Sequence, residues 1–188
     1  APSVSAVTVR SSTDADGDSD NTTAIATDTL ECSWSFTDPD GDADHSTAEW
    51  FNGSISLGTG TTLSGVFAKG DTITCMVTPN DGTVDGTPDT DDILIDNAAP
   101  TVTDVTISAT TDMDGDGDPT TAVAGDTLEC TYTLDDADGD SPTPIFGWTI
   151  GASNVGNGPT LSNAFAKGET VTCMVTPNDG TVDGTPDT

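Results

Sequence analysis

Clusters of aspartate are the residues of this chain whose type and spacing best suit chemistry. Calcium takes six to eight oxygen ligands, and carboxylates at alternate positions around a glycine can wrap one ion. Such clusters occur in both halves of the chain, and they predict calcium binding. The candidate ligands are Asp14, Asp16, Asp18, Asp20, Asp38, Asp40, Asp42, Asp44, Asp81, Asp112, Asp114, Asp116, Asp118, Asp136, Asp138, Asp140 and Asp179.

The first loop in each half resembles the opening of an EF-hand, with acids at loop positions 1, 3 and 5. It departs from that motif at position 12, where Ile25 and Val123 stand in place of the bidentate glutamate. Other segments must therefore complete the ligand shell. The alternative is a solvated turn, because Asp-Gly is common in turns. Four acids at alternate positions in both halves favour the metal.

The chain is one 98-residue unit written twice, without insertion or deletion. Trp50 recurs as Trp148, and residues 74–90 are identical to residues 172–188. Each copy is long enough to bury a modest core. We therefore predict two domains, residues 1–98 and 99–188. Strings of similar modules are mostly built for reach, stiffness or adhesion.

Each copy holds two cysteines, which are Cys32 and Cys75 in the first and Cys130 and Cys173 in the second. This arrangement predicts one disulfide within each domain and an oxidising, extracellular setting. Four buried thiols are the alternative. Zinc is disfavoured, because the chain has no Cys-x-x-Cys pair and a single histidine, His45.

The charge balance is extreme, with 33 acidic residues against three basic ones. It excludes nucleic acid as a natural partner, because nothing neutralises phosphates. Adaptation to high salt and metal ligation both account for the acidity. The acids comprise 29 Asp and only four Glu, which favours metal ligation. No apolar run approaches 18 residues, so no membrane span is predicted.

Alternating apolar and polar residues predict strands throughout. In residues 30–36 the apolar side chains fall on one face together with Cys32, and residues 72–77 alternate in the same way around Cys75. Further strands are expected at residues 7–9, around Trp50, around Leu63 and at residues 93–95. No stretch has a helical period, so the fold class is all-β.

The order Cys, Trp, Cys on inward-facing strand positions is typical of immunoglobulin domains. With the Asp-rich loops and the segment Lys69–Gly82, repeated as Lys167–Gly180, the chain resembles tandem Ig-like and cadherin-like repeats of bacterial and archaeal surface proteins. Ile73 and Val171 stand where the tyrosine corner of antibody-type domains needs tyrosine. The resemblance implies two tandem Ig-like β-sandwich domains with an extracellular, architectural and often calcium-stiffened role.

In such domains the loops cluster at the two ends. We therefore expect residues 14–20 of the first domain to face residues 135–140 and Asp179 of the second across the junction. Asp96 and Asn97 lie in the short linker between the domains and are further candidate ligands, and Pro100 restricts that linker. This arrangement is similar to a cadherin calcium junction.

An enzyme is not expected. Acid–base catalysis by carboxylates needs a pKa raised by burial, whereas these acids are expected in solvent-exposed loops, and His45 is not repeated. The main functional hypothesis is a structural module of a surface filament, stalk or adhesin. The alternative is a calcium-dependent carbohydrate-binding or adhesive module with a glycan or cell-surface ligand. Asn21 and Asn52 begin acceptor patterns for N-glycosylation, and neither is repeated in the second copy.

The sequence predicts no final strand for the second domain. Residues 91–96 form a plausible final strand in domain 1, whereas domain 2 stops at Thr188, the counterpart of Thr90. Two explanations stay open: the chain continues into further tandem repeats, or a copy of itself donates a strand in a head-to-tail polymer. The alternating segment Ser3–Val9 is the candidate donor.

Overall fold

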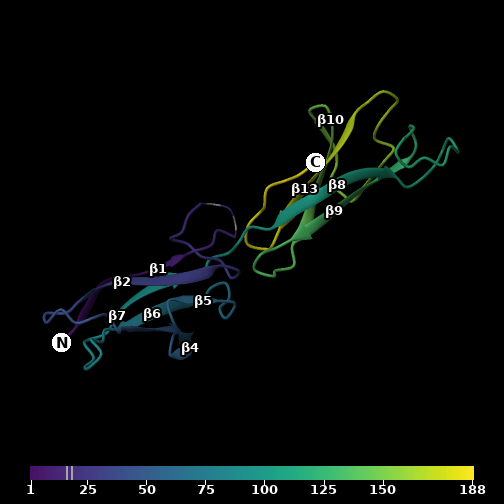
Figure 1. Ribbon diagram of the computed structural model, residues 1–188. Coiled ribbons are helices and arrows are strands. Elements are labelled where there is room, and N and C mark those ends of the chain that lie inside the picture. The colour runs from purple at the N-terminus through teal and green to yellow at the C-terminus, as the bar shows by residue number, and fades with distance from the viewer. Residues whose placement is uncertain (16, 18) are drawn as a thin grey trace. The chain divides into compact units, whose positions relative to one another are not determined.

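The computed structural model describes residues 1–15, 17 and 19–188, and all its regular elements are strands (Figure 1). The chain divides into two compact units, Ala1–Ala98 and Ala99–Thr188, which we call unit 1 and unit 2. The described residues contain no helix that is long and apolar enough to cross a membrane. The all-β prediction is confirmed.

Unit 1 consists of two antiparallel sheets. One has the strand order β1-β2-β5 and the other β4-β3-β6-β7. The strands are β1 (Ser3–Ser11), β2 (Thr29–Thr37), β3 (Thr47–Asn52), β4 (Ile55–Thr59), β5 (Thr62–Ser64), β6 (Thr72–Thr78) and β7 (Asp89–Leu94).

Unit 2 repeats this plan with the orders β12-β9-β8 and β11-β10-β13. Its strands are β8 (Thr101–Ala109), β9 (Thr127–Asp135), β10 (Thr143–Ile150), β11 (Ser153–Gly156), β12 (Thr160–Ser162) and β13 (Val171–Asn178). The described part of unit 2 has no strand that corresponds to β7. A single bridge stands at its place, where the backbones of Val175 and Asp187 exchange two hydrogen bonds of 2.9 and 3.1 Å.

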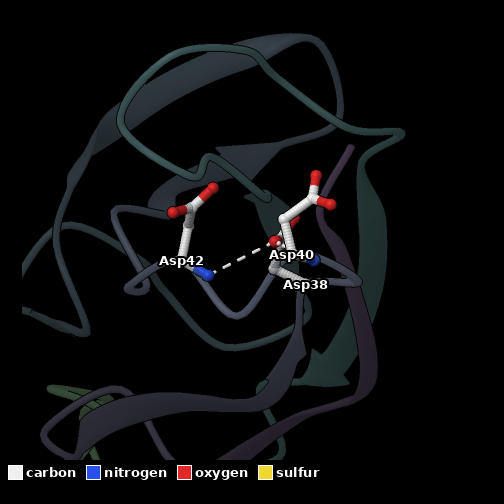
Figure 2. Close-up of side chains that lie close together, drawn as sticks. All are labelled: Asp38, Asp40 and Asp42. Atoms are coloured by element: carbon white, nitrogen blue, oxygen red, sulfur yellow. Dashed lines mark hydrogen bonds between the residues drawn. The ribbon is translucent and has the colours of Figure 1, made fainter.

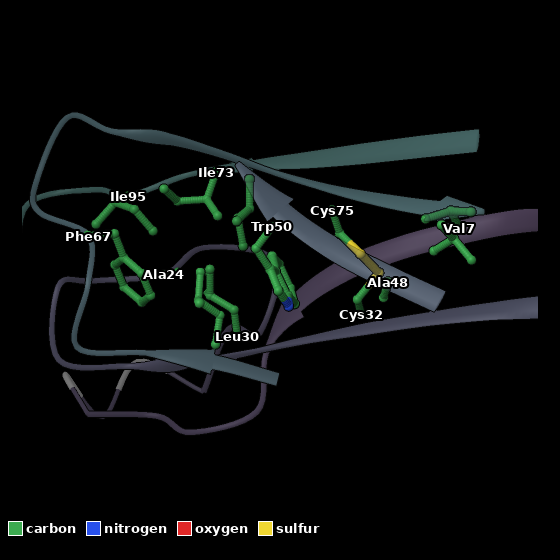
Figure 3. Packing of buried hydrophobic residues seen from close by; sticks show 13 residues of the cluster. Val7, Ala24, Leu30, Cys32, Ala48, Trp50, Phe67, Ile73, Cys75 and Ile95 are labelled. Atoms are coloured by element: carbon green, nitrogen blue, oxygen red, sulfur yellow. A yellow bond between two sulfur atoms is a disulfide. The ribbon is translucent and has the colours of Figure 1, made fainter. Parts of the chain in front are cut away.

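Side-chain alternation explains why these segments form strands around a core. Along β2, Leu30 and Cys32 are buried, whereas Glu31 between them and Ser33 after them are exposed. A strand places successive side chains on opposite faces, so one face stays dry. Figure 3 shows the resulting packing in unit 1, where Trp50 lies among Leu30, Ile73 and the disulfide. The Trp50 indole N–H is also satisfied, because it donates to the Gly60 carbonyl at 2.8 Å.

A disulfide joins the two sheets in each unit. Cys32 on β2 is bonded to Cys75 on β6, and Cys130 on β9 is bonded to Cys173 on β13. Both predicted pairings are therefore present, and no cysteine is free. Each bond closes a loop of 43 residues, which stabilises a unit by about 4 kcal/mol in the chain-entropy model.

The proposed donor segment is already used within unit 1. Residues 3–11 form β1, which pairs with β2 along most of its length, and Val7 is buried in the core. This segment would have to leave its own sheet before it could join another chain. A folded copy therefore does not offer β1 as a free strand.

Candidate metal centre

The loop that follows β2 gathers three carboxylates of unit 1. One oxygen of each of Asp38, Asp40 and Asp42 lies within 4.8 Å of the others (Figure 2). Asp38 shapes this loop, because its Oδ1 accepts hydrogen bonds from the backbone N–H groups of Asp40 at 2.8 Å and Asp42 at 3.3 Å. The glycine between them, Gly41, has φ of 80°, a conformation that glycine adopts without strain.

The corresponding loop of unit 2 is built in the same way. Oδ1 of Asp136 accepts from the N–H groups of Asp138 at 2.9 Å and Asp140 at 3.2 Å. Here the carboxylates that come within 4.8 Å are those of Asp136, Asp140 and Asp179. Asp179 lies after β13, so two loops far apart in the sequence meet at this site.

One carboxylate oxygen at each site is buried without a partner. Oδ2 of Asp38 and Oδ2 of Asp136 are enclosed, and neither accepts a hydrogen bond from any residue that the structure describes. Burying an unpaired polar atom costs free energy unless something compensates it. A cation bound between the carboxylates would supply that compensation. The same orphaned oxygen at corresponding positions of both units points to a shared property of the module.

The chemistry of the two groups fits a hard cation. The donors are carboxylate oxygens, and the described residues of these groups include no sulfur or imidazole. Calcium prefers this donor set and accepts irregular geometry, with water or carbonyls filling the remaining positions. Because Oδ1 of Asp38 and of Asp136 is committed to backbone N–H groups, each of these residues would ligate through Oδ2 alone.

A third group lies in the loop between β8 and β9, where Asp112, Asp114 and Asp116 approach within 4.8 Å. Hydrogen bonds from the backbone N–H of Gly117, and from those of Gly115 and Asp116, hold the pKa of Asp112 below its usual value, against partial desolvation. Asp114 has the opposite shift. Desolvation, a hydrogen bond shared with Asp112 and the charge of Asp116 raise its pKa. The group thus concentrates negative charge that a cation would neutralise.

The counterpart loop of unit 1 is described only in part. Oδ2 of Asp14 accepts from the Ser19 N–H at 3.2 Å, and Oδ1 of Asp20 accepts from the N–H and hydroxyl of Thr22. These two bonds lower the pKa of Asp20. The candidate ligands Asp16 and Asp18 lie outside the described residues. Asp118 in unit 2 caps Thr120 as Asp20 caps Thr22, and its pKa is lowered for the same reason.

Two further candidates are engaged elsewhere in unit 1. Asp44 accepts hydrogen bonds from the Ser46 N–H at 2.8 Å and from the Trp34 indole N–H at 3.1 Å. Asp81 accepts from the N–H groups of Thr83 and Val84. Neither belongs to a three-carboxylate group within the described chain. Asp81 therefore differs from its counterpart Asp179, which does.

The linker residues make other contacts in the structure. The amide oxygen of Asn97 accepts a hydrogen bond from the Lys69 ammonium at 2.7 Å, and the Asp96 carboxylate accepts from the Asn97 N–H. Asp96 joins none of the three-carboxylate groups found among the described residues. The expected calcium junction between the units stays a prediction.

The sequence patterns missed two buried acids that shape the first acidic loop of each unit. Asp28 is 3% exposed and Asp126 is 2% exposed. Asp28 accepts hydrogen bonds from the Thr13 hydroxyl and from the N–H groups of Ala15 and Ile25, and Asp126 repeats this arrangement in unit 2. Their recurrence at the same position before the Leu-Glu-Cys segment was the available signal.

The two glycosylation candidates differ in exposure. Asn21 is exposed in the loop before β2, whereas Asn52 is half-buried at the end of β3. Modification at either asparagine stays a prediction.

Comparisons of this chain with protein-family models, with curated proteins and with solved structures found no match.

Proposed function

We propose that the chain is an extracellular structural protein, in which two tandem Ig-like domains bind calcium and form part of a surface filament, stalk or adhesin. The observation that carries the calcium proposal is the buried, unpartnered Oδ2 of Asp38 and of Asp136, each beside two further carboxylates. A solvated turn would leave such an oxygen in water, whereas a cation site needs it turned inward.

The Ig-like assignment is supported by strand order. In unit 1, the sheets β1-β2-β5 and β4-β3-β6-β7 correspond to the orders A-B-E and C′-C-F-G of Ig-type sandwiches. The disulfide joins the strands in the B and F positions, and the buried Trp50 lies on the strand in the C position. Each of these features is also a feature of that fold.

An extracellular location is supported by the two disulfide bonds. Each unit carries a disulfide between buried cysteines, and structural disulfides persist mainly in oxidising compartments. A role in architecture is supported by repetition, because both units bury a tryptophan beside a disulfide, and Asp38 and Asp136 accept corresponding backbone hydrogen bonds.

Thermal unfolding in calcium and in excess chelator, at constant ionic strength, tests the metal. An ion present at ten times its dissociation constant adds about 1.4 kcal/mol per site. For a unit of this size that gain raises Tm by about 5–10 °C. Asp38→Asn and Asp136→Asn together should abolish most of the shift, because each removes the charge of the inward carboxylate.

Asp92→Asn is the matched control, since Asp92 is exposed on β7 and belongs to no three-carboxylate group of the described chain. It should keep the full calcium response. If calcium and chelator gave equal melting temperatures, the acidity would be an adaptation to salt and the calcium role would be lost.

A further inference from the structure

Unit 2 contains an asparagine whose side chain is placed to react with the backbone. An asparagine followed by glycine can cyclise, because glycine has no side chain to hinder its nitrogen and adopts the backbone torsions that the ring needs. The chain has two such pairs, Asn52-Gly53 in unit 1 and Asn157-Gly158 in unit 2. These two pairs have different surroundings in the structure.

The backbone at Asn52 is held in a strand. Asn52 is the last residue of β3, where it pairs with Ile55 of β4 on one side and with Ile73 of β6 on the other. Its side chain is half-buried. Ring closure brings the glycine nitrogen round to the side chain, which turns the backbone away from the extended conformation of a strand. Closure at Asn52 would therefore disrupt pairing on both of its sides.

The second pair lies outside the strands. Asn157 is exposed in the connection between β11 and β12. The Gly158 N–H donates no hydrogen bond within the described part of unit 2, whereas in unit 1 the corresponding Gly60 N–H donates to the Ala48 carbonyl at 2.9 Å. The nitrogen that would attack the side chain of Asn157 is therefore not committed to another partner.

A hydrogen bond also activates the amide that is attacked. The side-chain N–H of Asn154 donates to the side-chain oxygen of Asn157 at 3.0 Å, and the side-chain oxygen of Asn154 accepts from the Gly156 N–H at 3.2 Å. These two bonds hold the Asn154 amide at both ends. Negative charge develops on the attacked carbonyl oxygen as the ring closes, and a positioned donor stabilises that charge. Asn154 supplies such a donor to Asn157.

We propose that Asn157 is the residue at which the folded chain deamidates. The Gly158 nitrogen forms a bond to the side-chain carbonyl carbon of Asn157, and its proton passes through water to the side-chain nitrogen. The bond between that carbon and nitrogen breaks, and ammonia leaves. Water then opens the cyclic imide to give aspartate or isoaspartate, and each product adds a negative charge to unit 2. The proposal is independent of calcium binding.

The reaction site lies next to two contacts that hold the core of unit 2. The Gly158 carbonyl accepts a hydrogen bond from the buried Trp148 indole N–H at 2.8 Å, and the Pro159 carbonyl accepts from the Cys130 N–H at 3.0 Å. Trp148 and Cys130 both belong to the buried core. Isoaspartate adds a methylene group to the backbone just before these two carbonyls, so its formation displaces them and loosens the core.

Unit 1 makes both contacts without the reactive residue. The Gly60 carbonyl accepts from the Trp50 indole N–H, and the Thr61 carbonyl accepts from the Cys32 N–H, both at 2.8 Å. Thr59 stands in place of the asparagine. Of the two units, unit 2 is therefore the one expected to lose these contacts as the protein ages.

The test incubates the full chain, with its disulfides intact, in mildly alkaline buffer and follows each asparagine by peptide mapping and mass spectrometry. Asn157 should convert at least about tenfold faster than Asn52, because cyclisation at Asn52 needs local opening of β3. In the reduced chain in urea the two rates should become similar, since the strand and the hydrogen bonds are then lost. Conversion of Asn52 as fast as that of Asn157 in the folded chain would overturn the proposal. So would the same ratio of the two rates in the folded and the unfolded chain.

Asn154→Ala tests the donor. It should slow conversion of Asn157 in the folded chain by about two- to tenfold, because the hydrogen bond to the attacked carbonyl is lost. Ser153→Ala is the matched control, since Ser153 is exposed on the same strand, and it should leave the rate unchanged. Equal rates in the two variants would show that Asn154 does not activate the reaction.

Asn157→Asp separates the added charge from the longer backbone. Hydrogen exchange in β9 and around Trp148 should be faster in the purified isoaspartate form than in Asn157→Asp, whose backbone is unchanged. Equal exchange in the two proteins would show that the proposed loosening of unit 2 is wrong.

Discussion

The isoleucines of β7 and its extension offer the most direct test of how unit 1 is completed. Ile95 is 1% exposed and packs in the core, whereas the neighbouring Leu94 is 55% exposed. We expect Ile95→Ala to destabilise unit 1 strongly and Leu94→Ala to have little effect. The two substitutions sit side by side on the same segment and differ in the face on which the side chain lies.

The magnitude follows from burial. Replacing a fully buried isoleucine by alanine costs about 2–5 kcal/mol, because transfer free energy is lost and a cavity remains. In a domain of this size, 1 kcal/mol shifts Tm by about 4–8 °C, so Ile95→Ala should lower the Tm of unit 1 by at least about 8 °C. A substitution at an exposed position usually changes stability by no more than about 0.5 kcal/mol.

Calorimetry combined with hydrogen exchange read peptide by peptide assigns the loss to one unit. Exchange should accelerate in β6 and in the loop around Phe67, which contact Ile95. Peptides from unit 2 should be unchanged, since Ile95 belongs to unit 1. Equal Tm values for Ile95→Ala and Leu94→Ala would refute this account of the core.

Two further predictions concern single acids. Asp126→Ala should destabilise unit 2 by about 1.5–3 kcal/mol in urea unfolding, because it leaves the Thr111 hydroxyl and the N–H groups of Met113 and Val123 without their buried acceptor. Trp34 fluorescence should report the protonation of the Asp44 carboxylate, because the Trp34 indole N–H donates a hydrogen bond to it. Partial burial opposes the shift, but hydrogen bonds from the neighbouring serine and from Trp34 hold the pKa of Asp44 below its usual value, so its stabilising contribution is present above about pH 3.9 and is lost as pH falls through the lowered pKa. The fluorescence change should be absent in Asp44→Asn, and a midpoint above pH 4 would contradict the assignment.

Strands and disulfides could be predicted from sequence because both depend on a local period. Alternation around Cys32 and Cys75 placed both sulfurs on dry faces, and the structure confirms the bonded pairs. The hairpin strand β4 was not predicted. Only two of its residues, Leu57 and Gly58, are half-buried and the rest are exposed, so its position depends on pairing with β3 and not on a hydrophobic pattern.

The acidic loops show which features of a site sequence patterns cannot predict. Alternating aspartates predicted a metal, but they could not tell which carboxylates gather. Asp40 belongs to the group in unit 1, whereas Asp179 belongs to the group in unit 2, although the surrounding segments are near copies. Which carboxylates come together depends on how two loops of the same unit approach each other in three dimensions. The buried Asp28 was missed because in sequence it looks like any other aspartate near a turn.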